Sequence, residues 1–211
     1  MKTVLVHPTY GSPIVQYAAI VQGERLLFEA KDNYQKQTYR NRMKIATSSG
    51  MLQLTIPILH RKDRLERQQS FEVRIENKFH WQRDHWRSLK VSYQTSPYFE
   101  YYEDSFEPLY HRTYDKLMDF ILALHELIMD CLQVENNMDF TTSFEKNPLD
   151  VHDFRHYAKA KQYPDIELPH YHQLFNEKHG YLKNLTVLDL LFNEGPNALT
   201  YLENISFTQA K

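Results

Sequence analysis

The sequence predicts a single-domain α/β protein, with a β-α-β sheet core in residues 1–110 and a mainly helical portion in residues 111–211. Three observations favour this fold. The 211 residues, 42% of them hydrophobic, suffice for one domain with a substantial core, whereas two domains would each be unusually small. Near the N-terminus, strand-forming runs alternate with apolar residues at helical spacing, and helical spacing dominates the second half.

The first elements form a candidate β-α-β unit. Thr3 to His7 is a short strand-forming run, and Pro13 opens a stretch of apolar residues at helical spacing. Gly23 ends this helix, and Arg25 to Ala30 follows as a strand whose continuous apolar run is typical of a buried parallel strand. We therefore expect two parallel strands joined by a helix.

The middle of the sequence predicts a hairpin, a charged loop and one more strand. Met43 to Thr47 and Met51 to Pro57 alternate as strands about a turn at Ser48 to Gly50. His60 to Gln69 is almost entirely charged or amide, which is typical of an exposed loop and also allows a lid over a site. Phe71 to Ile75 reads as a further strand.

Helices are expected in the remaining chain. The periodicity predicts helices over His80 to Gln94, Tyr110 to Val134 (the longest) and Leu185 to Asn193, the last of them ended by Gly195. Cys131 is the only cysteine and falls on the apolar face of the second helix. It cannot form an internal disulfide, and we expect it to pack in the core.

The charge is distributed unevenly along the chain. Residues 1–95 contain 16 Lys and Arg against 8 Asp and Glu, whereas residues 96–211 contain 9 against 19. Either the basic half receives an anionic ligand or the two halves attract each other, and both can hold. A nucleic-acid partner is not expected, because the acidic half would repel a phosphate backbone. No apolar run is long enough for a membrane span, so we expect no membrane insertion and a cytoplasmic location.

Polar residues gather where the two parallel strands end. Ligands of β-α-β units bind beyond the C-terminal ends of the strands, which here lead into His7 to Ser12 and Lys31 to Arg42. Five basic residues and one acid lie between Lys31 and Lys44. Arginine grips phosphate or carboxylate through two hydrogen bonds, so this segment favours a small anionic substrate. The alternative is a solvated surface segment without a ligand.

Two residues of these segments are candidate catalytic groups. The imidazole of His7 titrates near neutral pH and could act as a general acid or base, and Asp32 could orient the acceptor. The alternative is a structural role, which is the more frequent one for an isolated histidine. The candidate substrate-binding residues are Tyr10, Asn33, Lys36, Tyr39, Arg40, Asn41, Arg42 and His85.

Other chemical motifs are weak or missing. His152 and His156 have the i, i+4 spacing of helical metal ligands, but no acidic partner completes a known zinc motif, and we assign no metal site. No phosphate-binding loop or dinucleotide fingerprint is present, so the cofactor stays unassigned. The aromatic series with Trp81, His85 and Tyr93 could stack a sugar or nucleobase ring, or it could be core.

Four blocks in order resemble the WbqC-like protein family. They are His7-Pro8-Thr9-Tyr10 with Pro13 and Tyr17; Asp32-Asn33-Tyr34 to Tyr39-Arg40-Asn41-Arg42; Trp81, His85, Tyr93 and Pro97-Tyr98-Phe99; and Leu185 to Leu191. The family pattern has His-Gln-Pro-Asn-Tyr in the first block and, in longer members, a glycine-containing segment where Asn136 to Pro169 has no glycine. The resemblance implies one WbqC-like domain over residues 1–211.

The resemblance also implies a function. Family members occur with bacterial cell-surface polysaccharide genes, and one suggested role is transfer of glycine or another small acyl unit to an amino sugar. We therefore expect a transferase acting on a small anionic or nucleotide-sugar substrate. The alternative is a non-enzymatic anion-binding or assembly protein, and a homo-oligomer is compatible with either. A pocket lined by both His7 and Arg40 would favour the enzyme, whereas an apolar patch over Tyr93 to Tyr110 would favour the assembly protein.

Overall fold

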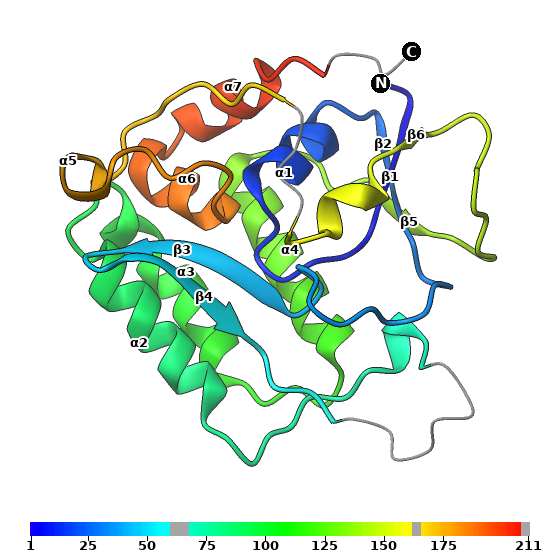
Figure 1. The fold of residues 1–211 in the computed structure, drawn as a ribbon, viewed down its shortest axis with the longest axis horizontal. Helices are drawn as coiled ribbons and strands as arrows, with labels where there is room; N and C mark the ends of the chain where they lie inside the picture. The colour runs from blue at the N-terminus through cyan, green and yellow to red at the C-terminus, as the bar shows by residue number, and fades with distance from the viewer. Residues whose placement is uncertain (60–67, 162–165, 208–211) are drawn as a thin grey trace.

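The computed structural model describes residues 1–59, 68–161 and 166–207, and it confirms the mixed α/β fold. In Figure 1 the parallel sheet lies on the right and a β-hairpin with two helices lies on the left. Buried apolar side chains from both halves of the sequence form one core cluster. The predicted β-α-β half and the predicted helical half therefore share a core.

The parallel sheet has the strand order β5-β2-β1-β6 within the described residues. Its strands are β1 (Thr3–Val6), β2 (Arg25–Phe28), β5 (Met138–Phe140) and β6 (His152–Asp153). All three pairings are parallel. The chain adds β2 and β5 on one side of β1 and then returns to add β6 on the other. Such a reversal leaves a crevice at the C-terminal ends of the strands, which is where open α/β sheets bind ligands.

Helix α1 (Ile14–Val21) is the predicted connection between β1 and β2. Pro13 precedes its first turn, and Ile14 to Ile20 are all buried. Gly23 follows the helix, and a Cβ there would lie 2.8 Å from a methyl carbon of Val4. Only glycine lets the chain turn this close to the first strand. The sequence therefore predicted this unit from the two features that create it, an apolar helix and a small residue at its end.

The predicted hairpin is also present. Strands β3 (Arg42–Thr47) and β4 (Gly50–Thr55) pair antiparallel, and Gly50 has a positive φ of 104° at the turn. Helix α2 (Trp81–Tyr93) packs against β3, and the Tyr93 hydroxyl accepts a hydrogen bond from the Ala46 backbone N–H at 3.1 Å. The hairpin is thereby attached to the helical layer.

The long helix predicted over Tyr110 to Val134 was wrong at its beginning. The structure has two helices there, α3 (Phe99–His111) and α4 (Leu117–Leu132). The chain leaves helical geometry at Arg112, which has an extended ψ of 134°. Backbone groups of the intervening segment bond elsewhere: Asn77 donates to the Tyr114 carbonyl, and the Leu117 N–H donates to Val73. Apolar residues on both helices preserved a helical spacing across the break.

The strand predicted over Phe71 to Ile75 was also wrong. A short 3-10 helix, η1 (Ser70–Glu72), occupies its first half, and isolated bridges connect Arg74 and Ile75 to Lys116 and Ile58. The alternation that suggested a strand reflects two buried side chains in an extended segment that finds no continuous partner. Of the loop predicted over residues 60–69, residues 60–67 lie outside the described residues, and so does the proposed lid.

The C-terminal part supplies the remaining elements. They are η2 (Arg155–Ala158), α5 (Asn176–His179), α6 (Val187–Glu194) and α7 (Asn197–Glu203). Thr186 caps α6 by accepting a hydrogen bond from the Leu188 N–H, and Gly195 ends it, as predicted. Cys131 is half-buried and packs against the core. Among the described helices none is long and apolar enough to cross a membrane.

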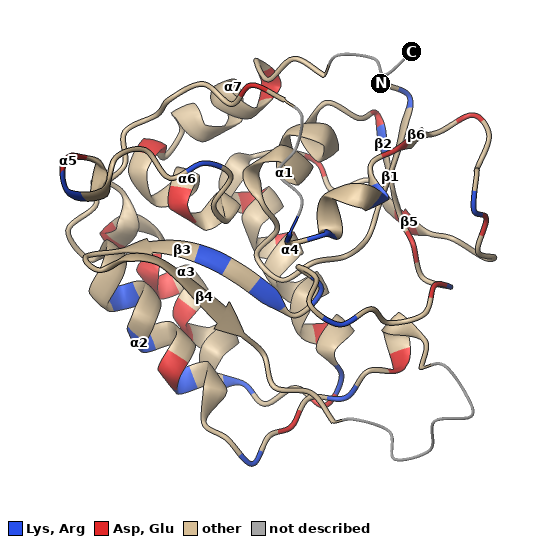
Figure 2. Ribbon diagram, viewed as in Figure 1, with Lys and Arg blue, Asp and Glu red and all other residues tan. Residues whose placement is uncertain are grey.

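Ion pairs connect the basic first half to the acidic second half. Among the described residues, the surface pairs of this kind are Arg25 with Asp139, Arg74 with Asp115, and Lys90 with the partly buried Glu103. Figure 2 shows basic positions along β3 and residues of both signs on α2, whereas the charged Lys, Arg, Asp and Glu positions of α3 are all acidic. Part of the charge asymmetry is therefore attraction within the fold. Exposed pairs contribute little each, typically about 0–1 kcal/mol.

Candidate functional site

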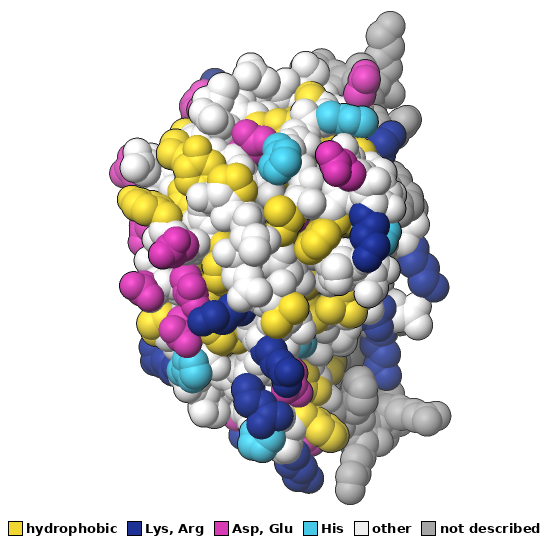
Figure 3. Space-filling view, turned by 90° about the vertical axis from the view of Figure 1, so that its left-hand side faces the viewer, with side chains coloured by type: hydrophobic (Ala, Val, Ile, Leu, Met, Phe, Trp, Pro, Cys, Tyr) yellow, Lys and Arg dark blue, Asp and Glu magenta, His cyan; other side chains and the backbone are white. Residues whose placement is uncertain are grey.

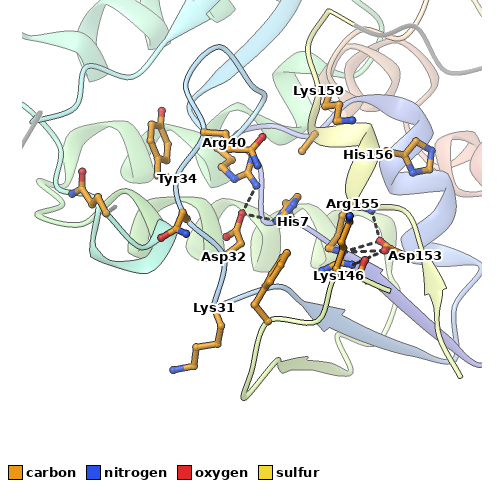
Figure 4. A pocket seen from close by; sticks show the side chains of 15 residues that line it. His7, Lys31, Asp32, Tyr34, Arg40, Lys146, Asp153, Arg155, His156 and Lys159 are labelled. Atoms are coloured by element: carbon orange, nitrogen blue, oxygen red, sulfur yellow. Dashed lines mark hydrogen bonds and ion pairs between the residues drawn. The ribbon is translucent and has the colours of Figure 1, made fainter. Parts of the chain in front are cut away.

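A cavity of about 910 Å³ lies at the C-terminal ends of the parallel strands. His7 follows β1, Asp32 follows β2 and Arg155 follows β6, and all three line it (Figure 4). The cavity is as large as those that hold small molecules and cofactors. The remaining lining residues are Lys31, Asn33, Tyr34, Gln35, Arg40, Gln68, Phe144, Lys146, Asp153, His156, Ala158 and Lys159.

The first wall of the cavity is a buried cluster around Asp32. Arg40 donates through Nη2 to Asp32 Oδ2, and the Ser70 hydroxyl donates to Asp32 Oδ1 at 2.6 Å. Nδ1 of His7 lies 3.5 Å from Asp32 Oδ2. The exposed fractions are 8% for His7, 4% for Asp32 and 3% for Arg40. Three polar groups are therefore held almost out of water, and their mutual geometry is fixed by charge and packing.

The His7 ring is kept neutral by its surroundings. Burial lowers its pKa well below the ordinary value, and the positive charges of Arg40 and Arg155 lower it further. Its Nδ1 atom is fully buried beside Asp32, yet the side chain lines the cavity and keeps 10% of its surface accessible. The ring therefore reaches the cavity by its other edge, which carries Nε2. A neutral imidazole presented in this way can accept a proton.

The second wall is a buried ion-pair cluster around Arg155. Its Nη1 donates to Glu29 Oε2 at 2.9 Å, and its Nη2 and Nε donate to the carboxylate of Asp153 at 2.7 and 2.9 Å. Glu29 is 1% exposed and also accepts from the Thr141 hydroxyl at 2.8 Å. The hydrogen bonds from Arg155 to Asp153 raise the pKa of the guanidinium, and Glu29 adds to this rise. This cluster joins β2, β6 and the segment after β5.

The lining of the cavity carries an excess of positive charge. Five of the residues are Lys or Arg and two are Asp. Both aspartates are bonded to the buried arginines. The remaining cations, Lys31, Lys146 and Lys159, are exposed side chains at the edge of the cavity. An anionic group is therefore the ligand that this cavity suits electrostatically.

Two predicted binding residues lie in the core instead of the cavity. Tyr10 is fully buried, and its hydroxyl forms a hydrogen bond of 2.9 Å with Nδ1 of His85, on which its ring also stacks. Burial lowers the pKa of His85 to about 4, so it is neutral at physiological pH. Trp81 packs edge-on against the same ring. The aromatic series of α2 is therefore core packing, the second of the two interpretations that the sequence allowed.

The polar segment after β2 is only partly a cavity wall. Asp32, Asn33 and Arg40 line the cavity, together with neighbours that the sequence did not single out. Lys36 is exposed outside the lining, and Arg42 is half-buried at the start of β3. The other two predicted residues are buried.

Tyr39 and Asn41, the two buried members of that segment, fix its path. The Tyr39 carbonyl accepts from the Tyr10 N–H at 2.9 Å, and the Tyr39 N–H donates to Ala158 at 2.8 Å. The Asn41 side chain donates to the Ile56 carbonyl, and the Asn41 carbonyl accepts from the Ile56 N–H, both at 2.9 Å. These hydrogen bonds fix the backbone immediately before and after Arg40.

Sequence reasoning missed Glu29, Asp153 and Arg155. Glu29 was included in a predicted buried strand, and a carboxylate in such an apolar run was a usable signal for a buried partner. No comparable signal marked Asp153 and Arg155, because β6 is two residues long. His152 lies in that strand and His156 in η2, so the helical spacing that suggested a metal pair does not apply.

Comparison with known proteins identifies the family. The family model of the WbqC-like protein family matches residues 10–151, which is more than half of the chain. The chain belongs to the WbqC-like protein family. This membership relates it to polysaccharide biosynthesis. No curated protein and no solved structure matches the chain. The WbqC-like match includes Asp32 and Arg40 of the first wall, whereas His7 and Arg155 lie outside it.

The last block of the WbqC-like resemblance surrounds a buried carboxylate. Asp189 of α6 is fully buried and accepts hydrogen bonds from the hydroxyls of Tyr93, at 2.7 Å, and Tyr171. Burial raises its pKa to about 6, although the two hydrogen bonds oppose the rise. Because Tyr93 also bonds to β3, this network ties α2, α6 and the hairpin together, away from the cavity.

Proposed function

We propose that this protein is a transferase of cell-surface polysaccharide biosynthesis that moves a small acyl or glycyl-type group onto the nitrogen of an amino sugar or related anionic substrate. The observation that carries the proposal is the cavity in which His7 and Arg40 meet. It combines a buried neutral imidazole with a surplus of cations, at the strand ends where α/β proteins bind ligands. Family membership supports the connection to polysaccharides.

The cations would hold the anionic part of the substrate. Lys146 and Lys159 lie on the wall that carries Arg155, and Lys31 lies on the wall that carries Asp32 (Figure 4). A phosphate or carboxylate between these walls replaces solvent contacts by charge-assisted hydrogen bonds. The same placement brings the rest of the substrate beside His7, so binding energy is used for orientation.

His7 would act as the general base. The amine nitrogen attacks the acyl carbon of an activated donor, a new C–N bond forms, and the leaving group of the donor departs. The amine proton passes to the accessible edge of His7, and Asp32 stabilises the resulting imidazolium. A bound anion offsets the charges of Arg40 and Arg155, which raises the pKa of His7 and makes it a stronger base when substrate is present.

The test separates binding from transfer. Thermal unfolding is measured with pyrophosphate and nucleotide-linked amino sugars for the unmutated protein, for the Lys146→Ala, Lys159→Ala double variant, and for His7→Gln. We expect the anions to raise the Tm of the unmutated protein and of His7→Gln. The lysine double variant should bind them at least about tenfold more weakly, a change of about 1.4 kcal/mol in binding free energy. A matched control removes two exposed lysines elsewhere, Lys78 and Lys116.

Transfer is then assayed with the nucleotide-linked amino sugars and with glycyl and acetyl thioesters as donors, using mass spectrometry of the products. We expect product from the unmutated protein and about 100-fold less from His7→Gln. If no anion raises the Tm of the unmutated protein, the site assignment is wrong. Equal transfer rates for the unmutated protein and His7→Gln would exclude His7 as the base.

The alternative, a non-enzymatic anion-binding or assembly protein, would give anion binding without transfer. Exposed apolar side chains on the helical layer, Val91 of α2 and Tyr101 of α3, are the features an assembly role would use. On the side of the molecule shown in Figure 3, hydrophobic side chains lie in several separate groups among charged ones. A continuous apolar surface is what marks stable association, so the cavity supports the enzyme better.

A further inference from the structure

A second cavity of about 240 Å³ lies on the outer face of the parallel sheet. Leu5 of β1 and Leu27 of β2 are opposite each other in the strand register, and both line it. Their neighbours in sequence, such as Val4 and Leu26, belong to the core cluster, and alternate residues of a strand point to opposite faces. The second cavity is therefore separated from the core by the sheet itself.

The outer face is covered in an unusual way. Parallel sheets normally carry helices on both faces, but here the segment of residues 141–151 covers this one. The other apolar residues of the lining are Pro148, Leu149 and Val151 of that segment and Phe140 of β5. Leu5 is only 2% exposed, so the covering segment shields the floor of the cavity from water. What results is a small slot with an apolar floor beside the second wall of the large cavity, the wall that carries Arg155.

Arg155 lines both cavities. It reaches Glu29, in the lining of the small cavity, and its Nη2 donates to the Lys146 carbonyl at 3.2 Å, in the lining of the large one. Figure 4 shows this side chain in the wall of the large cavity, next to His7. A ligand that extends past Arg155 would therefore place one part in each cavity.

The polar groups of the small cavity are already engaged or exposed. Glu29 accepts from Arg155, from Thr141 and from the Lys31 N–H at 2.9 Å, so its carboxylate is fully used. Glu145, the other acid of the lining, is exposed. A glycyl group carries an ammonium that needs a buried anionic partner, which these residues do not offer. The apolar floor offers instead a surface for hydrocarbon.

We propose that the small cavity binds a short aliphatic acyl chain of the transferred group, while the large cavity holds the anionic part of the ligand. This inference rests on the proposed function and narrows it from acyl or glycyl to acyl. A volume of about 240 Å³ equals that of about eight water molecules in the liquid, so the small cavity suits a short chain and not a long one.

Alkyl phosphates test the inference, because their phosphate fits the large cavity and their chain the small one. Dissociation constants are measured by calorimetry for methyl, propyl, butyl and octyl phosphate. We expect affinity to rise about two- to fourfold for each methylene from methyl to butyl, and to gain little more at octyl. The isosteric pair propyl phosphate and 2-aminoethyl phosphate compares a methyl group with an ammonium, and we expect the propyl compound to bind more tightly.

Filling the cavity should abolish the effect of chain length. Leu27→Trp places a large ring in the slot, and Val151→Phe does so from the covering segment, should the first variant fail to fold. Both are expected to bind methyl phosphate like the unmutated protein and to bind butyl phosphate no better than methyl. Met51→Trp, at an exposed apolar position on β4, is the matched control and should retain the full gain.

The results distinguish failure of this inference from failure of the proposed function. If methyl and butyl phosphate bind the unmutated protein equally, the chain site is refuted and the anion site stands. The inference is also overturned if 2-aminoethyl phosphate binds more tightly than propyl phosphate, or if both filled variants keep the gain. Should no phosphate compound bind at all, the proposed function fails with it.

Discussion

Replacing Asp189 by Asn should change how the stability of this protein depends on pH. The carboxyl is fully buried, and its pKa rises from the ordinary 3.8 to about 6. Each pKa unit corresponds to about 1.4 kcal/mol, so this rise amounts to about 3 kcal/mol. Between about pH 4 and pH 6 the folded protein binds this proton more strongly than the unfolded chain does. The free energy of unfolding therefore falls as pH rises through this window.

Above about pH 6 the folded protein bears the whole cost of burying an ionised carboxylate. Asn at this position carries no charge, so Asp189→Asn removes that dependence. We expect the free energy of unfolding of the variant, minus that of the unmutated protein, to increase by about 2–3 kcal/mol from pH 4 to pH 7. The stability difference at any single pH also includes the altered hydrogen bonds to Tyr93 and Tyr171, so only its change with pH reports on the pKa of Asp189.

Urea unfolding followed by tryptophan fluorescence at pH 4, 5, 6 and 7 gives this difference, since the chain has two tryptophans, Trp81 and Trp86. Asp130→Asn, an exposed carboxylate on α4, corrects for the loss of one charge. The stability difference between Asp189→Asn and the unmutated protein could instead stay constant over the pH range or decrease toward pH 7. Either result would refute the conclusion that burial raises the pKa of Asp189.

Two further substitutions test the buried ion pair of Glu29 and the glycine that ends α6. Glu29→Gln should lower the free energy of unfolding, measured in urea, by about 2–3 kcal/mol, because Arg155 loses a buried partner. Asp139→Asn, in an exposed ion pair, should lower it by less than about 1 kcal/mol. Equal losses would contradict a stabilising role of the buried Glu29–Arg155 pair. Gly195→Ala should cost about 2–4 kcal/mol, because φ is 52° and a Cβ would lie 2.5 Å from the Tyr98 ring. Gly180→Ala, with positive φ but open space, should cost less, and a loss as large as that at Gly195 would exclude a clash.

The sequence predicted the elements whose local pattern agrees with their environment. β1, α1 and β2 follow one another with a proline and a glycine at the helix ends, and all three were confirmed. The strands β5 and β6 have three and two residues, too few to carry a periodic pattern, and β5 lies in a polar segment. These two strands form because β1 and β2 leave unpaired edges with which they can form hydrogen bonds. This cause lies in the tertiary structure and cannot be read from the local sequence.

The candidate site was predictable on one wall only. His7, Asp32 and Arg40 follow two strands that adjoin in sequence, so a topological rule was enough to bring them together. Arg155 reaches the same cavity after a return of more than a hundred residues, and its partner Glu29 is visible only as a charge within an apolar run. Tyr10 and His85 were expected in the site, but polar aromatic side chains can also satisfy one another in a core, and here they do.

The brevity of β6 has a kinetic meaning. Its register pairs only Val4 with His152 and Leu5 with Asp153, and one further backbone bond joins Phe154 to Leu5 at 2.8 Å. So short a ladder opens at a lower free energy than the core, and amide hydrogens there should exchange before those of β1 and α4 do. Beyond it, the ion pairs of Arg155 hold the wall closed. Local opening at β6 can thus expose the wall that carries Arg155, while the core that carries His7 stays folded.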